Sequence, residues 1–221
     1  MNLRSISRAL TVALGVFALG ASAVPADSFA KKNKNKSAEP LEIKETKVSS
    51  FDDVFSQVGE IKTDLDKVQS DLAEASDKIA EAMGMSKGTP VADALADLKE
   101  KGKDHIKLTV AGDKPSLTVD DAAPENVKAA VNATNGAVIL WVDSAKTLAG
   151  LVEKSKAVAA AAQELPPQVP DAAKELAPGD ALKFPKLVKH NVDATMQTKD
   201  QVGAVAEALK TNLETVKSFG Q

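Results

Sequence analysis

The feature that most constrains this chain is a long stretch from Pro124 to Leu165 that has no proline after its first residue. Because proline breaks helices, its absence here predicts one continuous helix, which also carries the chain's single tryptophan, Trp141. The middle of the stretch, from Ala137 to Val142, is apolar on every side of a helical wheel. We therefore expect other elements to cover it all round, as the core of the molecule.

A second long helix is predicted from a heptad pattern that begins at Phe51. All positions of the seam are apolar: Phe51, Val58, Leu65, Leu72 and Ile79, with Val54, Ile61, Val68, Ala75 and Ala82 three places later. This spacing indicates a helix that packs along a partner helix, as in a coiled coil. We expect Ser50 to cap its start and Gly84 to end it.

Shorter elements are predicted between these two helices. Thr89 followed by Pro90 is typical of a helix start, with Thr89 as the cap, and Gly102 marks the end of that short helix. Apolar and polar residues then alternate over 105–110 and 117–119, with turn residues between them. This alternation predicts a small β-hairpin that must lie on the helices, because an isolated hairpin is only marginally stable.

The last part of the chain begins with a proline-rich crossover. Helical spacing then resumes from Pro185 to Phe219, although the polar residues 197–200 leave open whether this is one helix or two. Together the elements predict a mainly α fold. It is an elongated antiparallel bundle of three long helices and one or two short helices, with a small β-hairpin, and residues 50–221 form a single domain.

The N-terminal segment has the features of a secretory signal peptide. Arg4 and Arg8 precede an uncharged apolar run, which ends in the small residues Ala21, Ser22 and Ala23. The run is shorter than the roughly 20 residues of a membrane span. We expect residues 1–23 to be removed near Ala23 and the protein to be exported, as a periplasmic or secreted protein. Since the chain has no cysteine, it must be held together by packing alone.

The charge distribution separates a basic segment from an acidic body. We predict that residues 24–49 form a disordered basic tether, which carries Lys31, Lys32, Lys34 and Lys36. In contrast, residues 41–221 hold 22 basic and 29 acidic residues and have a net charge of −7. Aromatic residues make up 3% of the chain. Nucleic-acid binding is therefore not expected, because it requires clustered cations and stacking aromatics.

The sequence predicts no catalytic residue, cofactor site or metal site. The two histidines, His105 and His190, stand outside any ligand-spaced motif, and nucleotide-binding and nucleophile-elbow motifs are absent from the sequence. The acidic pairs Asp52/Asp53 and Asp120/Asp121 precede helices, where capping explains them. We therefore expect a protein that is not an enzyme; the alternative is an enzyme with an unfamiliar site.

One cluster is a candidate for contact with anions or lipid headgroups. It lies at the start of the last helix and consists of Lys183, Lys186, Lys189 and His190. The alternative interpretation is a solvated helix start without a ligand.

These observations favour an exported, non-enzymatic protein of the cell envelope. It would act as a structural, adaptor or chaperone-like binding module, whose partner is an unknown envelope protein or lipid. The heptad seams also allow a homo-oligomer. The alternative function is that of a membrane-active or lipid-binding helical bundle, of the carrier or pore-forming type, suggested by the apolar run 137–142 and the basic cluster.

Overall fold

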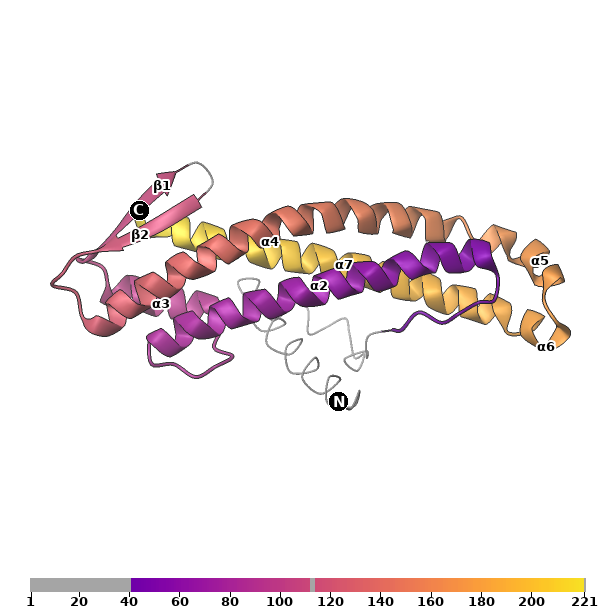
Figure 1. Ribbon diagram of the computed structural model, residues 1–221, viewed down its shortest axis with the longest axis horizontal. Coiled ribbons are helices and arrows are strands. Elements are labelled where there is room, and N and C mark those ends of the chain that lie inside the picture. Colours follow the sequence, from indigo (N-terminus) through magenta and orange to yellow (C-terminus); the bar gives the residue numbers. More distant parts are fainter. Residues whose placement is uncertain (1–40, 112–113, 221) are drawn as a thin grey trace, which may run out of the picture. The chain divides into compact units, whose positions relative to one another are not determined.

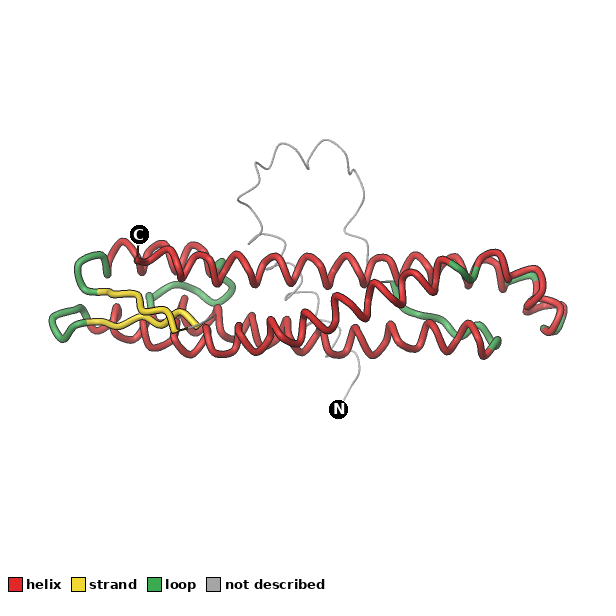
Figure 2. The backbone as a smooth tube through the Cα atoms, turned by 90° about the horizontal axis from the view of Figure 1, so that it is seen from above, coloured by secondary structure: helices red, strands yellow, loops and turns green. Residues whose placement is uncertain are grey.

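The computed structural model describes residues 41–111 and 114–220, and these are mainly helical (Figures 1 and 2). The predicted signal peptide and the first part of the predicted tether lie outside the described residues. The long helices are α2 (Ser49–Ala82), α4 (Glu125–Gln163) and α7 (Phe184–Lys217), and the short helix α3 spans Val91–Lys101. The strands β1 (Ile106–Ala111) and β2 (Lys114–Val119) form the hairpin. The predicted class, a helical bundle with a small β-hairpin, is confirmed.

The crossover between α4 and α7 consists of four short helical turns. They are η1 (Pro166–Gln168), α5 (Val169–Ala172), η2 (Ala173–Glu175) and α6 (Pro178–Ala181), and a last turn, η3 (Ser218–Gly220), follows α7. The C-terminal stretch, for which the sequence left open one helix or two, forms the single helix α7, which continues through the polar residues 197–200.

The described residues divide into two compact units. Unit 1 contains residues 68–111, 114–146 and 206–220, and unit 2 contains residues 41–67 and 147–205. Each of the three long helices contributes residues to both units. The single domain expected for residues 50–221 remains a prediction.

The core of unit 2 contains an aromatic cluster where the starts of α2 and α7 meet the end of α4. Phe51 and Phe184 contact each other edge to face, with ring centroids 5.0 Å apart. The buried group is completed by Val48, Phe55, Ala162, Leu165 and Val188. Because the starts of two helices meet the end of the third, α4 runs antiparallel to both α2 and α7 within this unit.

An extended segment, residues 41–48, precedes α2 and lies against α7. The Asn191 side chain accepts a hydrogen bond from the Lys44 amide at 2.9 Å and donates one to the Lys44 carbonyl at 2.6 Å. The Gln197 side chain accepts from the Leu41 amide at 2.9 Å. This part of the chain therefore differs from the disordered tether expected for residues 24–49, because α7 supplies partners for its backbone groups.

At the two ends of α2, the cap predicted for the start is absent and the glycine predicted for the end is present. Ser50 is not the cap; instead, Asp52 reaches back and accepts hydrogen bonds from the amide and hydroxyl of Thr46, both at 2.8 Å. At the other end Gly84 adopts a positive φ of 76°, and the Met85 amide donates to the Ala80 carbonyl at 2.8 Å. Gly84 thus ends the helix as predicted, because glycine adopts the left-handed conformation at little cost.

The heptad seam of α2 is confirmed by burial. Of its ten positions, eight are buried, and Val54 and Ala82 are half-buried. The side chains of Phe55, Leu72 and Ile79 are fully shielded from solvent. This apolar stripe of α2 is therefore buried within the chain itself.

In unit 1, α3 begins without the predicted side-chain cap. Pro90 occupies the N-cap position, and the Thr89 hydroxyl donates to the Ser86 carbonyl at 2.7 Å. Gly102 ends α3 as predicted. A Cβ atom at Gly102 would overlap the Ile106 side chain, so this close approach requires glycine.

The hairpin extends further than the sequence indicated. Its strands pair from Ile106 opposite Val119 to Ala111 opposite Lys114, so that Pro115 lies within β2 and not in the turn. Leu117 is 2% exposed and faces the helices. The Asn135 side chain of α4 accepts from the Leu117 amide and donates to the Leu117 carbonyl, both at 2.8 Å.

The middle of α4 is only partly covered. Trp141 is fully buried, but Ile139 is 56% exposed and Leu140 is 40% exposed. The expectation that other elements cover this run all round is therefore wrong. The hairpin is fixed one helical turn away, at Asn135, and leaves Ile139 accessible.

Two glycines inside α4 are not required by close packing, since a Cβ atom at Gly136 or Gly150 would meet nothing within 4 Å. None of the described helices is long and apolar enough to cross a membrane.

Candidate functional site

The predicted basic cluster lies in unit 2, where the crossover leads into α7. The Leu182 amide donates to the Pro178 carbonyl, and the Leu187 amide donates to the Lys183 carbonyl at 3.1 Å. Phe184 and Val188 point into the buried core. Because residues three and four apart share a helix face, Lys186 and Lys189 lie on the opposite, outer side of α7.

The structure brings the three lysines of the cluster to the surface. Lys183, Lys186 and Lys189 are all exposed. Within residues 41–111 and 114–220, none of them forms an ion pair. Their ammonium groups are therefore accessible to an external anion.

His190, the fourth member of the predicted cluster, has an internal partner. Its Nε2 atom lies 2.8 Å from the carbonyl oxygen of Glu42, in the extended segment 41–48. A protonated Nε2 donates to this carbonyl. The contact gives His190 a role in holding the segment to α7, so we separate it from the three accessible lysines.

An exposed leucine directly before these lysines was not predicted from the sequence. Leu182 is 82% exposed, the most exposed large hydrophobic side chain of the described residues. Its backbone angles are helical, φ −66° and ψ −29°. It lies in the turn between α6 and α7, and Lys186 and Lys189 follow on the first two turns of α7. The signal available in the sequence was a leucine that precedes the first core position, Phe184, by two residues.

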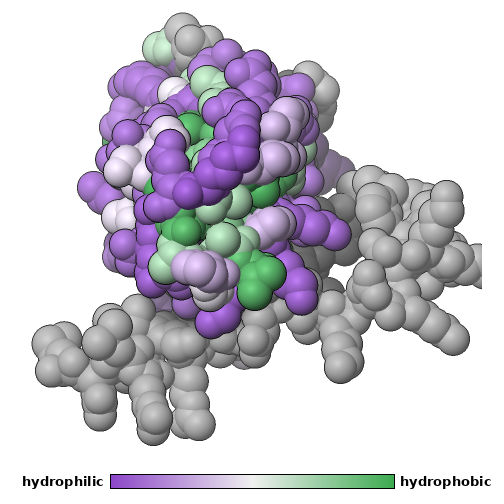
Figure 3. Space-filling view, turned by 90° about the vertical axis from the view of Figure 1, so that its right-hand side faces the viewer, coloured by the Kyte–Doolittle hydropathy of each residue, from purple (hydrophilic) through white to green (hydrophobic). Residues whose placement is uncertain are grey.

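The neighbouring short helices lie at the surface, since η1, α5, η2 and α6 contain no buried residue. Val169 of α5 and Leu176, which lies between η2 and α6, are half-buried and pack against the aromatic cluster of unit 2. Figure 3 shows the end of the molecule that carries α5 and α6, where hydrophobic residues lie among hydrophilic ones.

Nearby carboxylates are already paired with other lysines. Asp180 accepts a hydrogen bond from Lys47 at 2.9 Å, and this bond raises the pKa of Lys47. Asp171 pairs with Lys174 at 2.6 Å. Asp180, the acidic residue closest in sequence to Lys183, thus has a cationic partner of its own.

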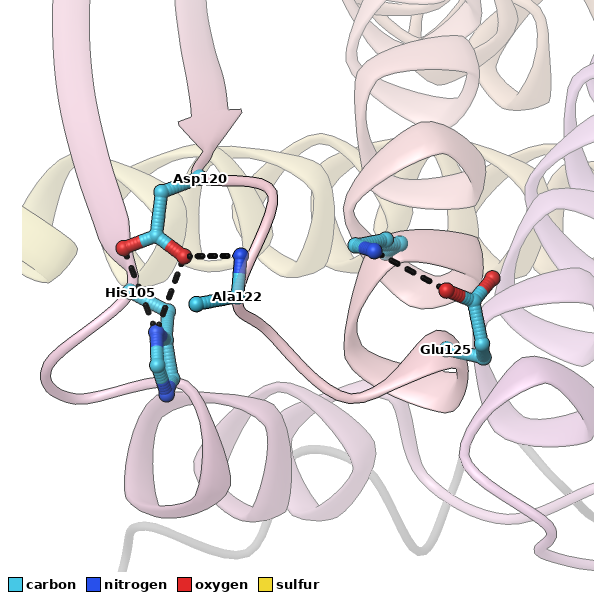
Figure 4. A network of polar contacts seen from close by, with 5 residues as sticks. His105, Asp120, Ala122 and Glu125 are labelled. Carbon is cyan, nitrogen blue, oxygen red and sulfur yellow. Dashed lines mark hydrogen bonds and ion pairs between the residues drawn. The ribbon is translucent and has the colours of Figure 1, made fainter.

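A polar network in unit 1 involves the other histidine (Figure 4). The Nδ1 atom of His105 lies 3.0 Å and 3.2 Å from the two carboxylate oxygens of Asp120. Asp120 also accepts from the Ala122 amide at 3.0 Å. The network closes the base of the hairpin, since the Asp120 amide donates to the His105 carbonyl.

Beside this network, at the start of α4, Glu125 accepts a hydrogen bond from Lys128 at 2.9 Å, which raises the pKa of Lys128. The Glu125–Lys128 pair lies in the first turn of α4, and the His105–Asp120 contact lies where β2 ends. Both contacts therefore have a structural explanation. The described residues contain no group of three or more His, Cys, Asp or Glu side chains that could hold a metal ion.

Comparison with known proteins gives no relative, since no family model, curated protein or solved structure matches this chain.

Proposed function

We propose that this chain is an exported, non-enzymatic helical-bundle module of the cell envelope with a structural, adaptor or chaperone-like role. Export is supported by Arg4, Arg8 and the apolar run before Ala23. The binding role is supported by one observation in unit 1, the exposure of apolar side chains in the middle of the longest helix.

The proposed binding surface consists of Gly136, Ile139 and Leu140. Ile139 and Leu140 are adjacent and lie one turn after Gly136 on α4, and both apolar side chains are exposed. Gly136 adds no side chain, and the space beside it is open. A partner helix can therefore approach the α4 backbone closely while it covers Ile139 and Leu140.

The surroundings of this surface match the anatomy of a protein interface. Trp141 and Val138, on the opposite side of α4, are buried and fix the helix in unit 1. Asn135 and Asp143, one turn to either side of Ile139, provide a polar rim. An apolar centre with a polar rim is the usual arrangement at sites where proteins associate.

A photo-crosslinking experiment tests this proposal. A benzoylphenylalanine at position 139 should label a specific envelope protein, and the same residue at the exposed position 149 of α4 serves as the matched control. The double variant Ile139→Ser/Leu140→Ser should lose the partner but keep its stability to within about 0.5 kcal/mol, since the side chains are exposed.

A crosslink to a second copy would assign the surface to self-association. Failure to label any protein from position 139, together with a monomeric mass in sedimentation, would contradict the proposal.

A further inference from the structure

The outer surface formed by Leu182, Lys183, Lys186 and Lys189 in unit 2 fits a partner of a different chemical class. We infer that it attaches the protein to the anionic headgroups of a lipid bilayer, as a peripheral contact. The inference goes beyond the proposed protein-binding role, because the residues of the two surfaces belong to different units and can be altered separately.

Charge complementarity carries the first step. No aspartate or glutamate occurs between Asp180 and Asp193, whereas this interval holds three lysines. Asp180 itself is bound by Lys47 at 2.9 Å. The surface is therefore locally cationic on a body with a net charge of −7, and lysines near a membrane bind anionic lipids through their positive charge.

The position of Leu182 carries the second step. This 82% exposed leucine lies directly before Lys183, in the turn that leads into α7, and Lys186 and Lys189 are exposed on the first two turns of that helix. In such an arrangement the leucine enters the boundary between headgroups and acyl chains. The lysines lay their methylene stems along that boundary and keep their ammonium groups at the phosphates.

The contact is shallow and does not need the core to open. Phe184 and Val188, on the inner side of the same turn, are fully buried in the aromatic cluster. A single leucine among lysines supplies little apolar area for a specific protein interface, which buries about 800 Å² per partner. A fluid lipid layer, in contrast, adapts to one protruding side chain.

Co-sedimentation of the full chain with vesicles tests the inference. The vesicles contain phosphatidylcholine alone or mixed with phosphatidylglycerol. The test variants are Leu182→Ser and the triple variant Lys183→Gln/Lys186→Gln/Lys189→Gln. The matched control, Lys107→Gln/Lys210→Gln/Lys217→Gln, removes the same charge from exposed lysines of unit 1 and leaves the N-terminal lysines in place.

We expect binding to the mixed vesicles only. The test triple variant should weaken it on the order of 100-fold, and Leu182→Ser should weaken it about tenfold. The control triple variant should bind nearly as the unaltered chain does. Excess inorganic phosphate, at an ionic strength held constant, should not displace the protein, because the lipid surface is the partner. Circular dichroism verifies that each variant is folded.

Three results would overturn the inference: no binding to the mixed vesicles, equal losses in the two triple variants, or full competition by phosphate. The peripheral mode also requires that Trp141 emission stays unchanged and that the vesicles retain an entrapped dye. A blue shift or leakage would replace it with the membrane-active alternative. Since position 139 is unaltered in these variants, crosslinking from it is read out separately.

Discussion

Asn135 in unit 1 and Asn191 in unit 2 hold extended backbone by the same pair of hydrogen bonds, but their surroundings differ. The Asn135 side chain accepts a hydrogen bond from the backbone N–H of Leu117 and donates one to the Leu117 carbonyl. The Asn191 side chain makes the same two bonds with the backbone of Lys44. The hairpin at Asn135 also has its own cross-strand pairing. Among residues 41–111 and 114–220, the segment at Asn191 has no partner strand, and Gln197 and His190 of α7 supply additional contacts.

The difference shows how a helix can replace a strand as a hydrogen-bonding partner. A segment with no neighbouring strand needs several polar side chains from one helix, and the central one is fully buried, since Asn191 is 0% exposed. The hairpin needs only one such side chain, because the burial of Leu117 also holds it in place. The burial of the two asparagines should therefore determine their contributions to stability.

Of the two asparagines, Asn191 is expected to show the larger effect when it is changed to alanine. This change removes both bonds to Lys44 and leaves a partly buried amide and carbonyl without partners, so the free energy of unfolding should fall by about 2 to 3 kcal/mol. Urea denaturation measures the loss, and hydrogen exchange of residues 41–48 should increase. If exchange in this segment did not change, Asn191 would not be the group that holds it.

A smaller effect is expected for Asn135→Ala, about 1 kcal/mol, because water can reach the partly exposed site. Leu117→Ala serves as the comparison in the same hairpin and should cost about 2 to 4 kcal/mol, since that side chain is buried. A larger loss for Asn135→Ala than for Asn191→Ala in urea denaturation would reverse the comparison.

The smallest effect concerns the pH titration of Asp143 in unit 1. A hydrogen bond from Lys146 lowers the pKa of Asp143, and Lys114 of β2 lowers it further. A lowered pKa stabilises the fold above the unfolded value of about 3.9, and this contribution is lost as the pH falls through the folded value. NMR titration should show the pKa rising clearly in Lys146→Gln and slightly in Lys114→Gln. No change in Lys114→Gln would mean that the hairpin does not bring this lysine near α4.

Much of the fold follows from the sequence because the long helices carry strong local signals. The heptad from Phe51 and the proline-free stretch before Leu165 each specify a helix, and Gly84 and Gly102 end helices where predicted. The caps were less predictable. Asp52 reaches back to Thr46, and this contact depends on how the preceding segment lies against α7.

The candidate site was predictable only in part. Three lysines at helical spacing indicate a basic face, but the sequence does not reveal that His190 is bonded to Glu42, 148 residues away. Likewise, Ile139 was expected to be covered because its neighbours in sequence are core residues. Both errors have one cause, since tertiary contacts decide which side chains of a helix remain accessible.

The burial of Trp141 makes unit 1 observable by itself. The indole lies fully buried, its Nε1 atom has no hydrogen-bond partner among the described residues, and the chain has no other tryptophan. Fluorescence therefore follows the loss of packing in unit 1, whereas far-ultraviolet circular dichroism follows the helices of both units. The separation between the two unfolding curves is a direct measure of how cooperatively three shared helices join the units.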